Sequence, residues 1–183
     1  MDYYPIIASF FQHHLETASL AVDTIADVIA EAAEESARVI LDEGKLFAIG
    51  LGPDCASAVA LSSLMHRGLL RERPSLPVIE LAEHRTDPSV SSTQWVSQQL
   101  RALGQMGDLG LVFAATLGEA EVNHLASVAN QRQLNLIWFG AQGPGRSLNF
   151  SGLTLEAKLT MNQLVAVCLA RLIDISTFGP LED

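Results

Sequence analysis

Beyond residue 44, short apolar runs alternate with longer segments of helical pattern, and this alternation constrains the fold more than any other feature. The runs are four to eight residues long and apolar on both faces: KLFAIG at 45–50, LPVIEL at 76–81, LGLVFAAT at 109–116 and LNLIWFGA at 134–141. Such runs are typical of strands in a parallel sheet that helices cover on both faces. The sequence therefore predicts an α/β fold with a doubly wound parallel sheet.

The segments between the runs have the spacing of crossover helices: 56–68, 92–105 and 120–133. A weaker fifth strand is expected at GLTLEA, residues 152–157. The last segment, LTMNQLVAVCLARLIDIS at 159–176, is apolar nearly all round, which predicts a buried helix. Cys168 within it is then expected to be a small core residue.

The first forty residues predict two helices that precede the sheet. Apolar residues recur at helical spacing up to residue 40, and DEGK then ends the helix with Gly44 as the expected C-cap. The apolar segment 4–18 is expected to form a separate helix or arm that a second subunit covers. We expect one domain over 1–183, with N-terminal helices at 1–43 and an α/β sandwich at 44–183.

The charge of the chain excludes one class of partner and favours no other. The formal net charge is −10 and the 11 Lys and Arg residues form no basic stripe, so direct binding of nucleic acid is not expected. The acidic surface fits a basic protein partner or, more simply, solubility. No apolar run reaches a membrane span of roughly 18–20 residues and no signal peptide is recognisable, so we expect a cytoplasmic protein. No metal or cofactor motif is present, and the pair His13-His14 lacks further ligands.

Two loops follow predicted strands, where ligands bind in such folds. In GLGPD, Gly50 and Gly52 suit a phosphate cradle, but Pro53 removes a backbone donor and Asp54 adds a carboxylate. A carboxylate at about 4 Å from a phosphate charge costs on the order of 1 kcal/mol in water. In ATLGEAE, Thr116 offers a hydroxyl and Glu119 adds a second acid. Asp54 and Glu119 are therefore interpreted as capping residues at helix starts.

Three motifs carry a resemblance to a known family: ERPSLP at 72–77, RALGQMGD at 101–108 and LIDISTF at 172–178. Over most of its length the chain resembles the sugar isomerase (SIS) domain family, in the branch of the phosphoheptose isomerases and the DnaA initiator-associating protein DiaA. The resemblance implies a five-stranded parallel sheet between helices, in a homotetramer of intertwined subunits. It also implies a phosphosugar site at the two loops described above.

The chain departs from that family at the residues that carry the chemistry. By resemblance, the isomerases have a catalytic Glu at the position of Leu64 and a catalytic His at that of Asn162. Since Leu64 cannot move a proton and Asn162 has no useful pKa, catalysis by the family's mechanism is not expected. We therefore predict no catalytic residue, and a degenerate sugar-phosphate pocket built of Gly50, Gly52, Asp54, Thr116, Glu119 and Asn162.

Three functions stay open from the sequence. The first is a non-catalytic protein like DiaA that binds DnaA as a homotetramer, or a dimer, and promotes its assembly at the replication origin. The resemblance carries this contact over to Thr177 and Phe178, although Phe178 fits a helix-end core residue equally well. The alternative is a phosphosugar isomerase or phosphosugar-binding protein of the phosphoheptose isomerase type. The third is a diverged domain that binds a cationic or polyhydroxylated small molecule.

Overall fold

A five-stranded parallel sheet forms the centre of the computed structural model, which describes residues 1–82 and 90–180. The strand order is β2-β1-β3-β4-β5, and all four strand pairs are parallel. The strands are β1 (Leu46–Gly50), β2 (Val78–Ala82), β3 (Leu109–Phe113), β4 (Asn135–Phe139) and β5 (Ser147–Leu148). The first four are the strands that the apolar runs predict, so that prediction is confirmed.

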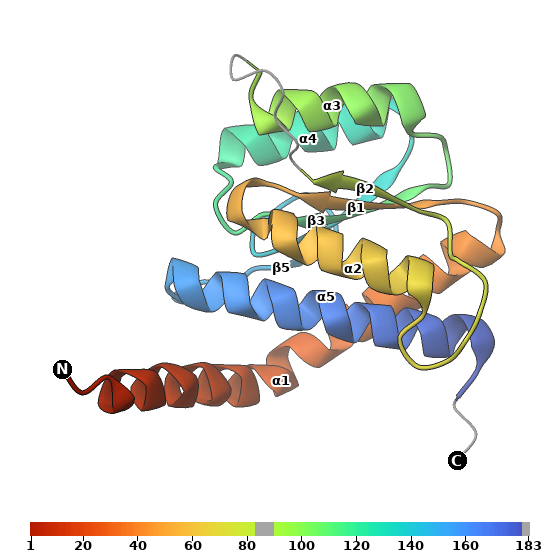
Figure 1. Ribbon diagram of the computed structural model, residues 1–183. Helices are drawn as coiled ribbons and strands as arrows, with labels where there is room; N and C mark the ends of the chain where they lie inside the picture. Colours follow the sequence, from red (N-terminus) through yellow and green to blue (C-terminus); the bar gives the residue numbers. More distant parts are fainter. Residues whose placement is uncertain (83–89, 181–183) are drawn as a thin grey trace.

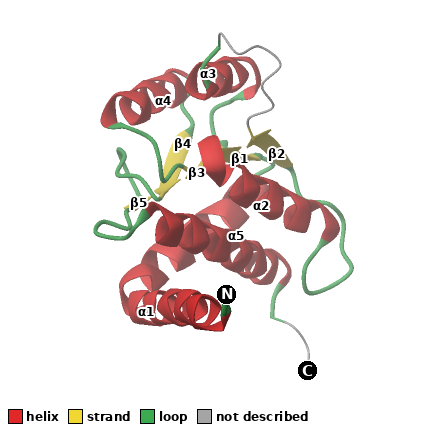
Figure 2. Cartoon of the chain, turned by 60° about the vertical axis from the view of Figure 1, so that its left-hand side comes forward, coloured by secondary structure: helices red, strands yellow, loops and turns green. Residues whose placement is uncertain are grey.

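Helices cover both faces of this sheet, as Figures 1 and 2 show. One layer holds α3 (Ser92–Leu103) and α4 (Glu119–Gln131), and the other holds α1 (Tyr4–Leu41), α2 (Cys55–Arg67) and α5 (Leu155–Phe178). A separate hydrophobic cluster fills the space between the sheet and each layer. The doubly wound α/β architecture and the three crossover helices are therefore confirmed.

The central strand β1 explains why the sequence shows continuous apolar runs. All five of its residues are buried. Phe47 and Ile49 belong to the cluster under α3 and α4, whereas Leu46 and Ala48 belong to the cluster under α1, α2 and α5. Because successive side chains point to opposite faces and both faces are covered, every position must be apolar.

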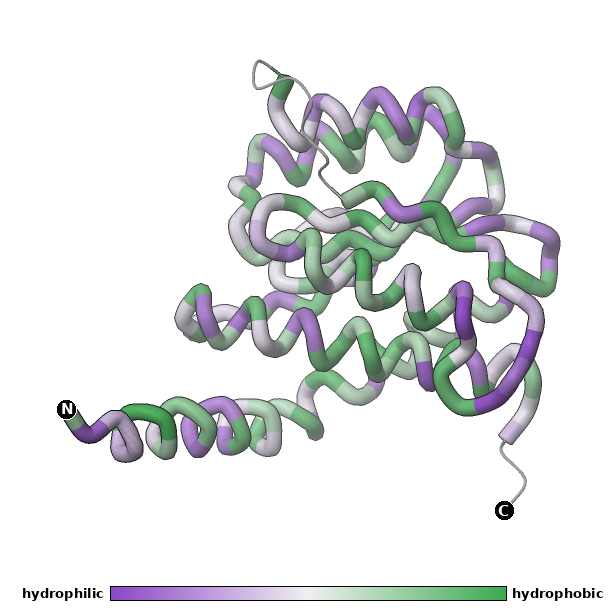
Figure 3. The backbone as a smooth tube through the Cα atoms, in the orientation of Figure 1, coloured by the Kyte–Doolittle hydropathy of each residue, from purple (hydrophilic) through white to green (hydrophobic). Residues whose placement is uncertain are grey.

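The N-terminal segment forms one helix, whereas the sequence predicts two. The prediction that residues 4–18 form a separate helix or arm is therefore wrong. The helix α1 runs without interruption from Tyr4 to Leu41, since no Gly or Pro breaks the sequence between residues 6 and 41. Its first half projects away from the sheet with its apolar residues uncovered, and Ile6 is 63% exposed. Figure 3 shows these apolar residues along the projecting part.

The end of α1 also differs from the prediction, because its C-cap is Asp42 and not Gly44. The N–H of Gly44 donates to the Val39 carbonyl and that of Glu43 to the Ile40 carbonyl, which is the Schellman arrangement. Glu43 takes the left-handed position with φ 63°, where glycine is usual. Glycine is needed one residue later, since a Cβ on Gly44 would lie 3.0 Å from the Gly107 carbonyl oxygen.

The fifth strand was expected at residues 152–157, and this is wrong. The fifth strand is β5, which ends at Leu148, and the predicted segment contains the start of α5. The side chain of Thr154 accepts a hydrogen bond of 3.3 Å from the Ala157 N–H and caps the helix. An N-cap threonine followed by an acidic residue favours a helix start over a strand.

The helix α5 is less buried than its composition predicts. One side packs into the core, but Leu164 is 49% exposed and Cys168 is also exposed, so the expected core role of Cys168 is wrong. Among the described residues, α5 is the helix long and apolar enough to cross a membrane, and 44% of the tested window is buried in the protein. It packs between α1 and α2, as a core helix does, so this is weak evidence for a membrane span.

Candidate functional site

The candidate site lies where the carboxyl ends of β1, β3 and β4 meet the helix α5. Strand β1 leads through a short 3₁₀ turn, Gly52–Asp54, into α2. A Cβ on Gly50 would lie 2.7 Å from the Asp54 carbonyl oxygen, and Gly52 has φ +59°. Both glycines of the predicted loop are thus required by the turn between strand and helix, whatever the loop binds.

Asp54 is the central side chain of this site and is only 1% exposed. Its Oδ2 accepts a hydrogen bond of 2.6 Å from the Ala115 N–H, and its Oδ1 accepts one of 2.8 Å from Asn162 Nδ2. It occupies the N-cap position of α2, yet its side chain makes no hydrogen bond to that helix. The expectation that Asp54 caps its own helix is therefore wrong, because the carboxylate turns inward to the loop after β3.

Asn162 closes the site from α5 and is fully buried. Its Nδ2 also donates to the Phe139 carbonyl at 3.3 Å, while its Oδ1 has no hydrogen-bond partner among the described residues. Gly140, with φ +87°, makes room for this contact, since a Cβ there would lie 2.8 Å from Asn162 Nδ2 and 3.0 Å from the Ala115 Cα. Three strand ends and α5 therefore converge on one buried carboxylate.

The electrostatics of the site follow from this geometry. Burial raises the pKa of Asp54, while the hydrogen bonds from Asn162 and Ala115 oppose that rise. Both donors are neutral, so neither compensates the charge as a cation would. The carboxylate occupies both the Ala115 N–H and the Asn162 amide as hydrogen-bond donors.

Thr116 and Glu119 have different positions relative to this site. Thr116 lies beside the first loop, since its Oγ1 would be 3.2 Å from a Cβ on Gly52. Glu119 is exposed at the first position of α4 and lines a hollow with Gln142. Its expected place at the start of a helix is therefore confirmed, but the carboxylate that caps α4 is Glu121, which accepts from the Gly118 N–H at 3.2 Å. The structure thus brings together five of the six predicted pocket residues: Gly50, Gly52, Asp54, Thr116 and Asn162.

Sequence reasoning missed two parts of this site, the Ala115 N–H and Gly140. A backbone donor has no residue-type signal, but the glycine directly after the predicted strand at 134–141 was a readable sign of close backbone approach. Leu64, at the position of the isomerases' acid, is half-buried on α2 and packs against the core. Within residues 1–82 and 90–180, no group of three or more His, Cys, Asp or Glu side chains is arranged to hold a metal ion.

The motifs ERPSLP and LIDISTF form a second polar cluster at the end of α5. Asp174 is fully buried and forms ion pairs with Arg71 at 2.9 Å and Arg73 at 2.6 Å. Arg73 also donates to the Met65 carbonyl at 2.8 Å. These contacts attach the loop before β2 to the last turns of α5.

The predicted partner residues Thr177 and Phe178 lie in that cluster. Phe178 is 40% exposed, and the Arg73 guanidinium lies 5.5 Å from its ring centroid. Arg71 donates to the Phe178 carbonyl at 3.3 Å, and the buried hydroxyl oxygen of Thr177 has no partner among the described residues. Phe178 is therefore not a core residue, because its side chain is partly exposed. Its ring is also not isolated, because the Arg73 guanidinium packs over it.

The third motif, RALGQMGD at 101–108, contains the end of α3 and the turn that leads into β3. Asp108 accepts hydrogen bonds from Lys45 Nζ at 2.6 Å and from the Gln105 N–H at 2.8 Å. Arg132 donates to the Gly104 carbonyl at 2.7 Å. The residues of this motif therefore connect the starts of β1 and β3 and the end of α4.

The sequence and the fold of this chain are similar to those of known proteins. No protein-family model matches the chain. The chain is 28% identical over 200 residues to the phosphoheptose isomerase of Chromohalobacter salexigens, covering 100% of both chains. It is 31% identical over 133 residues to that of Laribacter hongkongensis, covering 68% of each. A solved phosphoheptose isomerase from Francisella tularensis superposes with a TM-score of 0.83 at 21% identity, covering 95% of this chain and 99% of that one.

The sheet order and the loops at its carboxyl edge define a doubly wound α/β protein of the SIS fold. Within that class, the chain belongs to the phosphoheptose isomerase family. The similarity to solved structures shows the fold alone, because the identity is only 21%. The family membership follows from the sequence identity to the relatives.

Proposed function

We propose that this chain is a non-catalytic member of the phosphoheptose isomerase family that acts as an oligomeric protein-binding scaffold, in the manner of DiaA. The observation that carries the proposal is the Asp54 carboxylate, which accepts from the Ala115 N–H and from Asn162 Nδ2. These donors are thereby satisfied from within the protein, and a phosphate would meet a buried acid at that place. Leu64 and Asn162 supply neither a proton donor nor a base.

The oligomer is part of this proposal and has its own support. An apolar groove between α1 and α5 is lined by Val22, Ile25, Met161, Leu164 and Cys168. The projecting half of α1 exposes Ile6, Phe10 and Phe11 as well. A second copy of the chain would cover both surfaces, as a homotetramer or a dimer. Light scattering on the eluting protein tests this, and a monomer at micromolar concentration would contradict it.

The replication initiator DnaA is the partner that the resemblance of the α5 end suggests. Several linked copies would raise the local concentration of a bound initiator without any new contact. Capture of the organism's own DnaA by the immobilised chain is the test. We expect capture by the wild type and by the control Met106→Ala, which changes an exposed side chain elsewhere, and loss with Phe178→Ala. If the wild type retains no DnaA above background, this part of the proposal is wrong.

Phosphosugar binding is the second candidate, because the curated relatives are named phosphoheptose isomerases. Calorimetry with sedoheptulose 7-phosphate and other sugar phosphates decides between the two. On the scaffold proposal the wild type shows no micromolar binding of a sugar phosphate. Asp54→Ser removes the carboxylate and adds a hydroxyl that can donate, so this variant is the one expected to gain such binding. Micromolar binding by the wild type would overturn the scaffold proposal in favour of this one.

The proposal also places the protein in the cytoplasm. Cys168 is a free thiol, which fits a reducing compartment. Fractionation of cells that express the chain would test this placement.

A further inference from the structure

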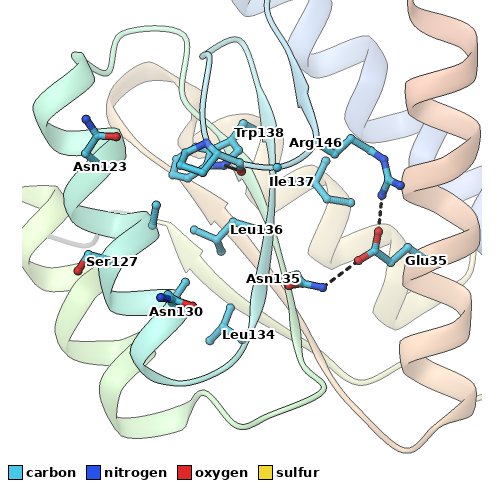
Figure 4. Close-up of a pocket in the computed structure, with 14 residues that line it drawn as sticks. Glu35, Asn123, Ser127, Asn130, Leu134, Asn135, Leu136, Ile137, Trp138 and Arg146 are labelled. Carbon is cyan, nitrogen blue, oxygen red and sulfur yellow. Dashed lines mark hydrogen bonds and ion pairs between the residues drawn. The ribbon is translucent and has the colours of Figure 1, made fainter.

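A groove at the open edge of the sheet, away from the Asp54 site, has the features of a peptide-binding surface. It has a volume of about 690 Å³ and opens along β4 between α4 and α1, as Figure 4 shows. Clefts of roughly 300–1,000 Å³ are typical of binding sites. Neither the strand ends nor the motifs discussed above use it.

The backbone of β4 is incompletely paired along this groove. In the described part of the chain, β5 pairs with β4 over Trp138 and Phe139 alone. The Trp138 N–H donates to the Arg146 carbonyl at 3.1 Å and the Gly140 N–H to the Leu148 carbonyl at 2.8 Å. Because backbone groups alternate along a strand, the N–H of Leu136 faces the same edge, at a position before the start of β5. Among the described residues, the Leu136 N–H makes no hydrogen bond across this edge.

The two walls of the groove differ in chemistry. On the α4 side, Asn123, Ser127 and Asn130 are exposed and line it with amides and a hydroxyl (Figure 4). On the α1 side, Glu35 accepts from Asn135 Nδ2 and pairs with Arg146. Arg146 also pairs with Glu31, so two carboxylates share one guanidinium.

We propose that this groove binds an extended segment of a partner protein that adds to the sheet beside β4 and carries a Lys or Arg. The open strand edge favours a peptide, because added strands gain affinity from main-chain hydrogen bonds and specificity from alternate side chains. The surplus carboxylate at Glu31 and Glu35 and the net charge of −10 favour a basic one. Its side chains facing α4 would be small and polar. This inference concerns another surface than the end of α5 and stands whether or not the chain binds DnaA.

Selection of peptides from a random heptapeptide library displayed on phage, with the full chain as bait, tests the inference. We expect enriched peptides with a basic residue and an alternating pattern. In hydrogen exchange, a synthetic copy of such a peptide should protect the Leu136 amide. Methylation of alternate peptide nitrogens should weaken its binding at least about tenfold, because it removes the main-chain donors.

Two substitutions on the exposed face of α4 serve as matched variants. Ser127→Lys places a positive charge in the groove and should weaken peptide binding about tenfold or more. His124→Lys adds the same side chain three residues earlier, in a different hollow, and should leave binding within about twofold. Glu31→Gln should weaken binding about two- to fivefold, as expected for an exposed charge pair.

Three results would overturn the inference. A library that yields no enriched peptide would do so, as would peptides that bind Ser127→Lys and wild type alike. Protection that appears elsewhere and spares Leu136 would also exclude strand addition at β4. None of these outcomes bears on DnaA capture or on sugar-phosphate binding, so failure here is distinguishable from failure of the scaffold proposal.

Discussion

Asp54 and Asp174 are both buried carboxylates, but their surroundings are opposite. Asp54 lies at the carboxyl edge of the sheet and accepts from two neutral donors, Ala115 N–H and Asn162 Nδ2. Asp174 lies at the end of α5 and faces two guanidinium groups. The first arrangement surrounds the carboxylate with neutral donors alone, whereas the second depends on the carboxylate to neutralise buried charge. We therefore expect the loss of the Asp54 carboxylate to destabilise the protein less than the loss of the Asp174 carboxylate does.

The largest effect is expected from Asp174→Ala. It leaves Arg73, whose side chain is 3% exposed, without its counter-charge. Removal of one partner of a buried pair costs about 3–5 kcal/mol in the free energy of unfolding. Urea denaturation measures this loss. Glu72→Gln, an exposed change in the same loop, is the control and should stay within about 0.5 kcal/mol. If Asp174→Ala and Glu72→Gln were equally stable, the Asp174 carboxylate would not be a structural requirement.

Asp54→Ala should cost less, about 1–3 kcal/mol, because it leaves the Ala115 N–H and the Asn162 amide unpaired in a buried place. Asp54→Asn should cost about 1 kcal/mol, because the Oδ1 of the new amide can still accept from the Ala115 N–H. Its Nδ2 can donate to the partnerless Oδ1 of Asn162 once the Asn162 amide flips, which gives up the 3.3 Å bond to the Phe139 carbonyl. The same denaturation experiment measures both. A loss for Asp54→Asn as large as that for Asp174→Ala would show that the negative charge at Asp54 is itself required.

The pH dependence of stability sharpens the comparison further. The pKa of Asp54 is raised by burial above its ordinary value of 3.8, so the folded state binds its proton more tightly than the unfolded state does. This contribution to stability is complete below the unfolded pKa and is lost as the pH rises through the folded pKa. We therefore expect the wild type to lose stability relative to Asp54→Asn as the pH rises from about 4 towards neutrality. A difference that stays constant, or changes in the opposite direction, would contradict the burial of an ionisable Asp54.

The smallest loss of stability is expected at an exposed carboxylate, Glu31, with which the losses at the two buried aspartates can be compared. Glu31 pairs with Arg146 at 2.9 Å, and its side chain is 59% exposed. Glu31→Gln should cost under about 1 kcal/mol, and less in high salt, because water screens the pair. Denaturation at low and at high salt measures both quantities. A larger, salt-independent loss would mean that this pair is as structural as that of Asp174.

Local pattern was sufficient for much of the fold and failed at identifiable places. The runs at 45–50 and 109–116 predicted strands correctly because both faces of those strands are buried and every residue had to be apolar. The segment 152–157 carries two competing signals: its apolar residues favour a strand, whereas Thr154 followed by Glu156 favours a helix start, and the helix start prevails. The apolar composition of α5 predicts burial all round, but composition alone does not show which apolar residues of a helix face the core and which stay exposed.

The sequence by itself determined the first four strands, the three crossover helices between them, the glycines of the first loop and the acid in it, because these depend on neighbours along the chain. Only the tertiary structure decided that Asp54 turns away from its own helix, towards Ala115 and Asn162, which lie 61 and 108 residues further along. It also decided that ERPSLP and LIDISTF meet through Asp174. The physical reason is that a buried polar group must find its partner wherever packing places one, and no local periodicity encodes that place.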